Sequence, residues 1–260
     1  MFTIRRIGPA AHILAWFVAL LPMTALSDVR SEAGKGVVTW ITGTIRPDDY
    51  AALLEIAKAT APGDTWHVGV NSGGGDVSTA LRMGRLLRER SASVNVGKDA
   101  VCLSSCVFLL AGATQRAVQT QLGARVGIHR PYNPSDEADT IQAQRNQQQG
   151  WAKTIKSYLA EMNLSPDIYD RMFRVAPHEM RILTRSELDA FGLSKNDPHW
   201  EDAQATRDAK RLGISKLDYL ERKSIAASVC KQYLRPDRLF DDLICEGNIL
   251  SGLPPGQGIK

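Results

Sequence analysis

Short segments rich in β-branched residues alternate with segments of helical periodicity through the first half of this chain. Strands are predicted at residues 37–45, 66–70, 94–96, 116–118 and 124–128. Helices are predicted between them, at residues 47–60, 77–87 and 107–113. Strands that alternate with helices indicate an α/β fold with a largely parallel sheet.

The second half of the sequence is mainly helical in pattern. We expect a long, glutamine-rich helix at residues 140–162 after a polar loop at 133–137, a short helix beginning at Pro166 and an edge strand at 180–183. Thr184 and Glu187 form a capping-box pattern, and the helix they begin should end near Gly192. Residues 199–260 are charged and helical, which predicts an appendage to a domain at 28–198.

The N-terminus has the layout of a secretory signal peptide at residues 1–27. Arg5 and Arg6 precede an apolar run at 10–21, and small residues lie just before Asp28. The run is shorter than the ~20 residues of a comfortable membrane span. We therefore predict a periplasmic or secreted protein, and an uncleaved segment that tethers it to a membrane remains the alternative.

Composition excludes few functions, but it argues against nucleic-acid binding. The 260 residues are 43% hydrophobic and 23% charged, which is ordinary for a globular protein. The formal charge of +4 is small, and no basic run is interleaved with aromatic residues. We therefore expect no nucleic-acid partner.

The four cysteines lie outside the signal segment, and an even number in an exported protein favours disulfides. Proximity in the sequence pairs Cys102 with Cys106 and Cys230 with Cys245. The first pair requires Cys102 to lie before its helix begins, because a regular helix holds residues four apart in poor geometry for bridging. A zinc site is the alternative, but no histidine has ligand spacing beside either pair, and we expect no metal or cofactor.

A glycine-rich segment joins the second predicted strand to the next helix, and it reads Asn71-Ser-Gly-Gly-Gly-Asp76. Glycines allow a sharp turn that presents backbone N–H groups to an anion, which could be a phosphate or the oxyanion of an acyl transfer. No Lys-Ser/Thr pair follows the glycines, which argues against a P-loop, and Ser78 breaks the dinucleotide fingerprint. A simple strand-to-helix turn remains the alternative.

Ser104 and Ser105 precede an apolar helix, and His129 ends an apolar strand. A serine in such a place is most often a helix N-cap, and a single histidine is most often a core or surface residue. A serine nucleophile, however, needs a base within reach and donors for the developing charge. The glycine-rich segment, the serine pair and the histidine together could supply all three.

The order and spacing of these segments resemble the ClpP-type serine peptidases of the ClpP/crotonase superfamily. The glycine-rich segment is similar to the family's Asn-Ser-Pro-Gly-Gly, with Gly73 where proline is usual. Leu103-Ser-Ser105 and the apolar residues after it resemble Ala-Ser-Met-Gly-Ala-Phe-Leu-Leu, and Arg125-Val-Gly-Ile-His129 resembles Arg-Val-Met-Ile-His. Residues 182–193 resemble the family's Phe-Leu-Ser-x-x-Glu-Ala-x-x-Tyr-Gly-Leu ending. The resemblance covers roughly residues 37–195 and implies a repeated ββα spiral with a long handle helix at 140–162.

The resemblance implies an exported serine peptidase that acts on a peptide or protein substrate. Ser104 would be the nucleophile, His129 the base, and the N–H groups of Gly74 and Ser105 the oxyanion hole. The family's third triad residue, an aspartate, corresponds to Met180. Neighbouring Glu179 is the better substitute, since a carboxylate can orient the imidazole.

Several alternatives remain open. His178 could replace Glu179, or the site could be a Ser–His dyad; the related signal peptide peptidase A type uses a lysine, for which only Lys153 is near in sequence and fits less well. The missing aspartate also favours an inactive binding or structural module with the same fold. A crotonase-like enzyme acting on a thioester is disfavoured by export, because coenzyme A is not expected outside the cytoplasm. The handle helix implies a homo-oligomer, unless residues 199–260 block or replace that contact.

Overall fold

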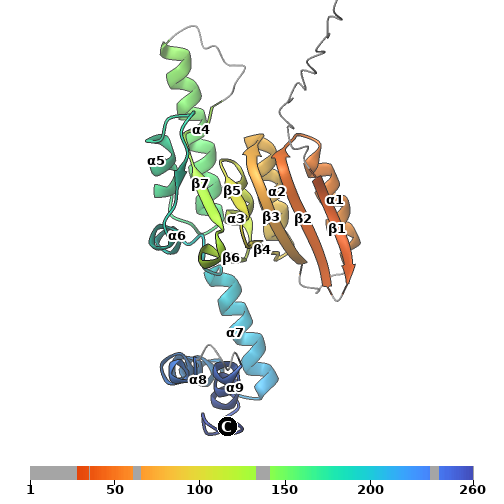
Figure 1. The fold of residues 1–260 in the computed structure, drawn as a ribbon, viewed down its shortest axis with the longest axis vertical. Helices are drawn as coiled ribbons and strands as arrows, with labels where there is room; N and C mark the ends of the chain where they lie inside the picture. The colour runs from red at the N-terminus through yellow and green to blue at the C-terminus, as the bar shows by residue number, and fades with distance from the viewer. Residues whose placement is uncertain (1–27, 35, 61–65, 133–140, 235–239, 260) are drawn as a thin grey trace, which may run out of the picture.

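The computed structural model describes residues 28–34, 36–60, 66–132, 141–234 and 240–259 of the 260-residue chain. Within these ranges the protein is an α/β structure with a mixed sheet, and a helical segment carries the C-terminus away from the sheet (Figure 1). The predicted signal peptide at 1–27 and the predicted loop at 133–137 lie outside the described residues.

The elements of the described residues follow the predicted alternation through the first half of the chain. The strands are β1 (Asp28–Gly34), β2 (Gly36–Ile45), β3 (Trp66–Gly75), β4 (Ser93–Val96), β5 (Val101–Leu103), β6 (Gln115–Val118), β7 (Arg125–Ile128) and β8 (Arg181–Ile182). The helices are α1 (Asp49–Ala59), α2 (Val77–Glu89), α3 (Cys106–Gly112), α4 (Ile141–Glu161), α5 (Asp167–Phe173), α6 (Arg185–Phe191), α7 (Pro198–Leu212), α8 (Lys216–Val229) and α9 (Asp241–Leu250), with short 3-10 turns η1 (Thr120–Leu122) and η2 (Cys230–Tyr233).

Strand β3 is the branch point of the sheet. On one side it pairs in parallel with β2, which is antiparallel to β1. On the other side its first half, from His67 to Gly69, pairs with β4, whereas Ser72 in its second half pairs with Cys102 of β5. Strand β4 in turn pairs in parallel with β6. Strand β5 pairs in parallel with β7, and β7 pairs with the antiparallel β8. The sheet therefore divides at β3, and its second branch brings β3, β5 and β7 side by side.

The core lies between this sheet and its helices. Strands β1 to β3 lie in front of α1 and α2 in the view of Figure 1. Apolar side chains from the sheet and from α1, α2, α3 and α4 form one continuous buried cluster. Helices α2 and α3 cross closely, since a Cβ atom on Gly112 would lie 2.6 Å from the Cα of Gly84. Glycine at this crossing lets α3, which follows the predicted nucleophile, pack deep in the core.

A single buried guanidinium joins the ends of three helices. Arg116 on β6 donates to the carbonyl oxygens of Ala111, Met162, Gly192 and Lys195 at distances of 2.9–3.3 Å. These carbonyls lie at or just beyond the C-terminal ends of α3, α4 and α6, where helices leave carbonyl groups without intrahelical partners. Burial lowers the pKa of Arg116 to about 10. The cation therefore supplies donors to two buried carbonyls, those of Ala111 and Met162, and to two partly buried ones.

The C-terminal segment has small cores of its own. Helix α7 begins at Pro198, where the sequence predicts the boundary between domain and appendage, and leads away from the sheet (Figure 1). One cluster contains Ala205, Ala209 and Tyr219, and a second contains Ile249 with the disulfide between Cys230 and Cys245. The predicted helical character of residues 199–260 is confirmed in the described part of that segment.

Three local predictions differ from the structure. Strand β1 and strand β5 were not predicted, because β1 is a largely polar edge strand and β5 has only three residues. The segment Asn71–Gly75, predicted as a turn, is extended and belongs to β3. Its glycines have little strand preference of their own, but the pairing with β2, which shifts register between Gly43 and Thr44, holds them extended.

The helix-terminus prediction is confirmed in detail. The Thr184 side chain accepts a hydrogen bond from the Glu187 N–H, and the Glu187 carboxylate accepts one from the Thr184 N–H. Gly192 ends the helix with φ +80°, the left-handed conformation expected at that position. None of the helices in the described ranges is both long and apolar enough to cross a membrane.

Candidate active site

Ser104 and His129 are in direct contact. The distance between Ser104 Oγ and His129 Nε2 is 2.7 Å, a hydrogen bond between side chains 25 residues apart in the sequence. Ser104 directly follows β5, and His129 directly follows β7, which is the neighbouring parallel strand. Because the two strands end at the same edge of the sheet, both side chains leave the sheet together. The predicted nucleophile and the predicted base are thus adjacent.

Ser104 sits in a strained turn between β5 and α3. Its φ is +55°, a left-handed conformation that costs a residue with a side chain on the order of 1–2 kcal/mol. Its N–H donates to the carbonyl oxygen of Gly127 on β7 (2.9 Å), and its own carbonyl accepts from the Val107 N–H (3.2 Å). Backbone strain of this kind persists where the surroundings hold it, and it is concentrated at functional sites. The turn lifts Ser104 out of the strand and aims its hydroxyl at His129.

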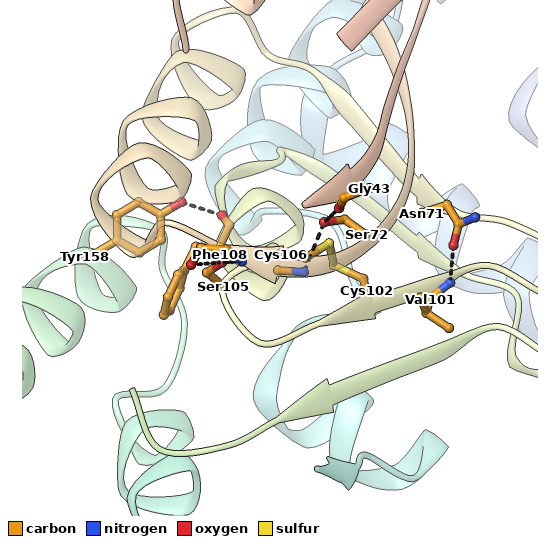
Figure 2. Close-up of a disulfide and its surroundings, with 11 residues drawn as sticks. Gly43, Asn71, Ser72, Val101, Cys102, Ser105, Cys106, Phe108 and Tyr158 are labelled. Atoms are coloured by element: carbon orange, nitrogen blue, oxygen red, sulfur yellow. Dashed lines mark hydrogen bonds between the residues drawn. A yellow bond between two sulfur atoms is a disulfide. The ribbon is translucent and has the colours of Figure 1, made fainter. Parts of the chain in front are cut away.

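A disulfide encloses this turn. Cys102 on β5 is bonded to Cys106 at the start of α3, and both residues are fully buried. Figure 2 shows the bond beside Ser72, whose hydroxyl donates to the Gly43 carbonyl (2.6 Å). Both predicted pairings, Cys102 with Cys106 and Cys230 with Cys245, are confirmed. The zinc alternative is wrong, because all four sulfur atoms are used in disulfides.

The glycine-rich end of β3 packs directly on the Ser104 turn. Gly74 has φ +94°, and a Cβ atom added to it would lie 2.7 Å from Ser104 Cβ and 3.0 Å from the Ser105 nitrogen. Glycine is therefore needed at 74 both for its backbone conformation and for the close approach. By contrast, a Cβ atom added to Gly73 would meet nothing within 4 Å. Only part of the glycine run is constrained by packing.

The predicted oxyanion donors differ in their availability. The Ser105 N–H, next to the nucleophile, has no hydrogen-bond acceptor among the described residues. The Gly74 N–H instead donates to Ser72 Oγ (3.1 Å), and the Gly75 N–H donates to Ser105 Oγ (2.7 Å). In this conformation the Gly74 N–H is therefore engaged by the hydroxyl of Ser72, and its role as an oxyanion donor stays a prediction. The Ser105 hydroxyl thus fastens the glycine strand beside Ser104, and the Ser72 hydroxyl fastens it to β2.

His129 is buried, and only 8% of it is exposed. Burial lowers the pKa of its imidazole below the ordinary value, and the backbone of Arg130 partly offsets this effect. The ring of Tyr132 lies 5.7 Å from the imidazole, centroid to centroid. At neutral pH the imidazole is therefore uncharged, the form that can accept the Ser104 proton.

The second ring nitrogen of His129 lacks the partner predicted for it. Among the described residues, His129 Nδ1 is buried without a hydrogen-bond partner. Glu179, the predicted third triad residue, is exposed and lines a separate surface depression with Arg174 and Met180. The Glu179 prediction is therefore wrong for this structure. Its N–H bonds to the Ala176 carbonyl in a turn ahead of β8, and this turn leaves the carboxylate in solvent.

The alternative partners do not replace Glu179. His178 is also exposed, and the ring of His129 has no bond to it. Lys153 is exposed on α4 and is not among the residues that line the site. Within the described ranges, the structure therefore brings together a serine and a histidine without a third side chain.

A cavity of about 570 Å³ opens above the two residues. Its walls come from the end of β2, the glycine end of β3, the beginning of α2, the turn after β5, the segment after β7, and α4. The lining residues are Thr44, Ile45, Gly73, Gly74, Gly75, Asp76, Val77, Ser104, His129, Pro131, Tyr132 and Trp151. A volume of this size suits a small ligand or one or two residues of a peptide.

Sequence reasoning did not identify several of the residues that shape this site. Ser72, Asp76, Tyr132 and Trp151 hold the glycine strand or line the cavity. The signal for Ser72 was its place as the one hydroxyl between an apolar strand and three glycines. Trp151 could be placed on the apolar face of its helix, but not opposite a serine 47 positions earlier, because that proximity is tertiary.

In the comparisons with known proteins, no family model matches this chain, and no curated protein matches its sequence. The chemistry of the site is therefore judged from its own geometry.

Proposed function

We propose that this protein is an exported serine hydrolase that cleaves peptide bonds with a Ser104–His129 dyad. The observation that carries the proposal is the 2.7 Å contact between Ser104 Oγ and His129 Nε2, made by a serine with φ +55° at the mouth of a cavity. An N-capping serine needs neither a strained backbone nor a histidine. A nucleophile needs its base within hydrogen-bond distance, and this contact meets that requirement.

The proposed reaction follows the general scheme of acyl transfer. Ser104 Oγ attacks the substrate carbonyl carbon while His129 Nε2 takes the hydroxyl proton, and the carbonyl oxygen becomes an oxyanion. The free Ser105 N–H stabilises that oxyanion. The C–N bond then breaks, and the imidazolium gives its proton to the leaving amine. Water, deprotonated by His129, releases the acid from the resulting ester and restores the serine.

A second oxyanion donor requires a small rearrangement of the glycine strand. The Gly74 N–H is held by Ser72 Oγ, a hydroxyl that also donates to the Gly43 carbonyl. A substrate oxyanion is a stronger acceptor than a neutral hydroxyl, because charge-assisted hydrogen bonds are about twice as strong. In the proposed mechanism the Gly74 N–H turns from Ser72 to the oxyanion when the substrate binds.

The fold is consistent with a ClpP/crotonase-like spiral. Strand β3 pairs with β2 along its length. On its other side it pairs first with β4 and then, further along, with β5, so two strand pairs share β3. Helix α4, which follows His129 in the sequence, is 21 residues long and lies where the resemblance implies the handle helix. The predicted homo-oligomer through this helix remains part of the proposal.

Export is the part of the proposal that rests on the sequence and the cysteines. Residues 1–27 have the pattern of a signal peptide. Two disulfides account for every cysteine, and stable disulfides are typical of oxidising compartments. Both features agree with a periplasmic or secreted location.

An active-site fluorophosphonate tests the proposal on the folded full-length protein. We expect covalent labelling at Ser104, located by mass spectrometry of the digested protein, and its loss in Ser104→Ala and His129→Gln. Ser78→Ala is the matched control, because Ser78 is exposed on the first turn of α2 and does not line the cavity. An unlabelled Ser104 in protein with intact disulfides would rule out the dyad as a catalyst.

A binding or structural module is the second candidate, and one observation favours it. His129 Nδ1 has no hydrogen-bond partner within the described part of the chain, so no carboxylate there stabilises the imidazolium that catalysis forms. In that case Ser104→Ala would leave the cellular phenotype intact, whereas disruption of the cavity by Trp151→Ala would abolish it. Loss of the phenotype in Ser104→Ala to the same extent as in Trp151→Ala would exclude this candidate.

A further inference from the structure

The lining of the cavity beside Ser104 is negatively charged. Among the described residues that line it, Asp76 alone carries a formal charge at neutral pH. His129 is neutral there because burial lowers its pKa. The nearby cation Arg130 is held elsewhere: its Nε donates to the Phe173 carbonyl (2.9 Å), and its guanidinium lies 4.6 Å from the Phe173 ring. The wall that a substrate meets is therefore negative.

Asp76 can contact a ligand without giving up its structural role. Its Oδ1 accepts a hydrogen bond from the Thr79 N–H (2.7 Å), which caps α2. Its Oδ2 has no partner among the described residues, and the side chain is exposed beside the cavity. A carboxylate with one oxygen in a cap and the other free is an acceptor for a cationic donor.

Two aromatic rings also line the cavity. Tyr132 is half exposed on the segment after β7, and Trp151 is half buried on α4. The faces of such rings attract guanidinium and ammonium groups. A carboxylate together with tyrosine and tryptophan favours a long side chain that has an apolar stem and a cationic end.

We infer that the cavity selects a substrate with arginine or lysine at the residue that supplies the scissile carbonyl, with Asp76 as the residue that determines specificity. The inference rests on the proposed function, because Ser104 attached to that carbonyl places the adjoining side chain nearest to the cavity. Tyr132 and Trp151 contact the stem and the cation, and Asp76 pairs with its charge. Acidic residues are disfavoured at the same position.

The main comparison of the test is between two side chains of the same shape, of which only one is charged. Fluorogenic peptide amides carry arginine, its uncharged isostere citrulline, or glutamate at the residue before the scissile bond. We expect kcat/KM to be about three- to tenfold higher for arginine than for citrulline, the size of an exposed ion pair with a cation–π contact. The glutamate peptide should be the poorest substrate.

Asp76→Asn isolates the charge. Asparagine caps helices as well as aspartate does, so α2 keeps its cap to Thr79. In this variant the ratio of kcat/KM for arginine to that for citrulline should fall at least twofold, to the smaller preference that the rings of Tyr132 and Trp151 supply. Asp167→Asn is the matched control, because Asp167 is exposed on α5 outside the cavity lining, and the ratio should stay at the wild-type value.

Binding to Ser104→Ala separates this inference from the proposed function. Calorimetry should show the arginine peptide binding more tightly than the citrulline peptide, with the difference reduced by adding Asp76→Asn. Hydrolysis or binding of both peptides with equal efficiency overturns the inference and leaves the hydrolase proposal standing. Selective binding without hydrolysis or fluorophosphonate labelling overturns the hydrolase and supports the cation site. Absence of both hydrolysis and binding overturns both.

Discussion

Gly74 lies against the Ser104 turn so closely that a Cβ atom added to it would be 2.7 Å from Ser104 Cβ. The two residues belong to paired strands of the sheet or their ends, since Gly74 is the penultimate residue of β3 and Ser104 directly follows β5. The Ser105 hydroxyl, next to Ser104, joins the same two segments by accepting a hydrogen bond from the Gly75 N–H of β3. The geometry of the nucleophile thus depends on a strand that does not contain it.

Gly74→Ala should therefore damage both stability and reactivity. A side chain at φ +94° and a clash with Ser104 should lower the free energy of unfolding by about 2–4 kcal/mol. Urea unfolding measures the loss, and fluorophosphonate labelling measures the displaced serine. Gly73→Ala is the control and should change stability by no more than about 0.5 kcal/mol, because its Cβ would meet nothing. Equal stability of the two variants would contradict the packing argument.

The reactivity of Ser104 should depend on pH with a midpoint below the ordinary histidine value of about 6.5. Burial lowers the pKa of His129, and the neutral imidazole is the form that accepts a proton. The labelling rate should rise with pH through the lowered pKa and reach its plateau by neutral pH. Rates measured across a pH series give the midpoint, and a midpoint at or above 6.5 would contradict the burial argument.

The same lowered pKa sets the sign of a stability effect. Between the two pKa values the unfolded chain binds a proton at His129 that the folded chain does not. Stability contributed at this residue is therefore present above the unfolded pKa and is lost as pH falls through it, down to the folded pKa. His129→Gln should weaken this acid destabilisation, which urea unfolding at pH 7 and pH 5 can measure.

The two disulfides should have different functions. Removal of the 15-residue link by Cys230→Ala with Cys245→Ala should lower the unfolding free energy of the C-terminal segment by about 3 kcal/mol, while Ser104 labelling stays unchanged. The bridge between Cys102 and Cys106 closes a shorter loop, so its removal by Cys102→Ala with Cys106→Ala should have a smaller chain-entropy effect on stability. We expect it to reduce Ser104 labelling about tenfold or more, since small misplacements of reacting atoms are costly. Unchanged labelling would make that bridge a packing element only.

Arg116→Met should be among the most destabilising single changes outside the site. It removes the donors to four carbonyls, two buried and two partly buried, at the ends of three helices, and the expected cost is about 3–5 kcal/mol. Arg116→Lys keeps the charge but has fewer donors, so it should give an intermediate loss. Thermal and urea unfolding measure both variants, and a loss below about 1 kcal/mol for methionine would show that water replaces the guanidinium.

The sequence was sufficient for features that depend on neighbours along the chain. The period of apolar residues predicted α1, α2 and α3, and the β-branched segments predicted β2, β3, β4, β6 and β7. Local hydrogen-bond chemistry predicted the cap at Thr184 and the end of its helix at Gly192. Proximity in the sequence predicted both disulfides. These features are local, so single-chain patterns determine them.

Tertiary structure decided what the sequence could not. Residues Asn71–Gly75 were predicted as a turn but are extended, because pairing with β2 outweighs the weak strand preference of glycine. Glu179 was predicted as the carboxylate next to Met180, where the resemblance placed an aspartate, yet the turn before β8 leaves the Glu179 carboxylate in solvent. The Gly74 N–H, predicted as an oxyanion donor, is bound by Ser72.

The contact between Ser104 and His129 shows both contributions. The sequence alone determined that a serine precedes a buried helix and that a histidine ends a strand. Only the parallel pairing of β5 with β7 brought Oγ and Nε2 to 2.7 Å, and the bond from the Ser104 N–H to Gly127 ties the strained turn to β7. The residues were determined locally, and their distance was determined by long-range strand pairing, because hydrogen bonds between strands fix which side chains meet at the edge of a sheet.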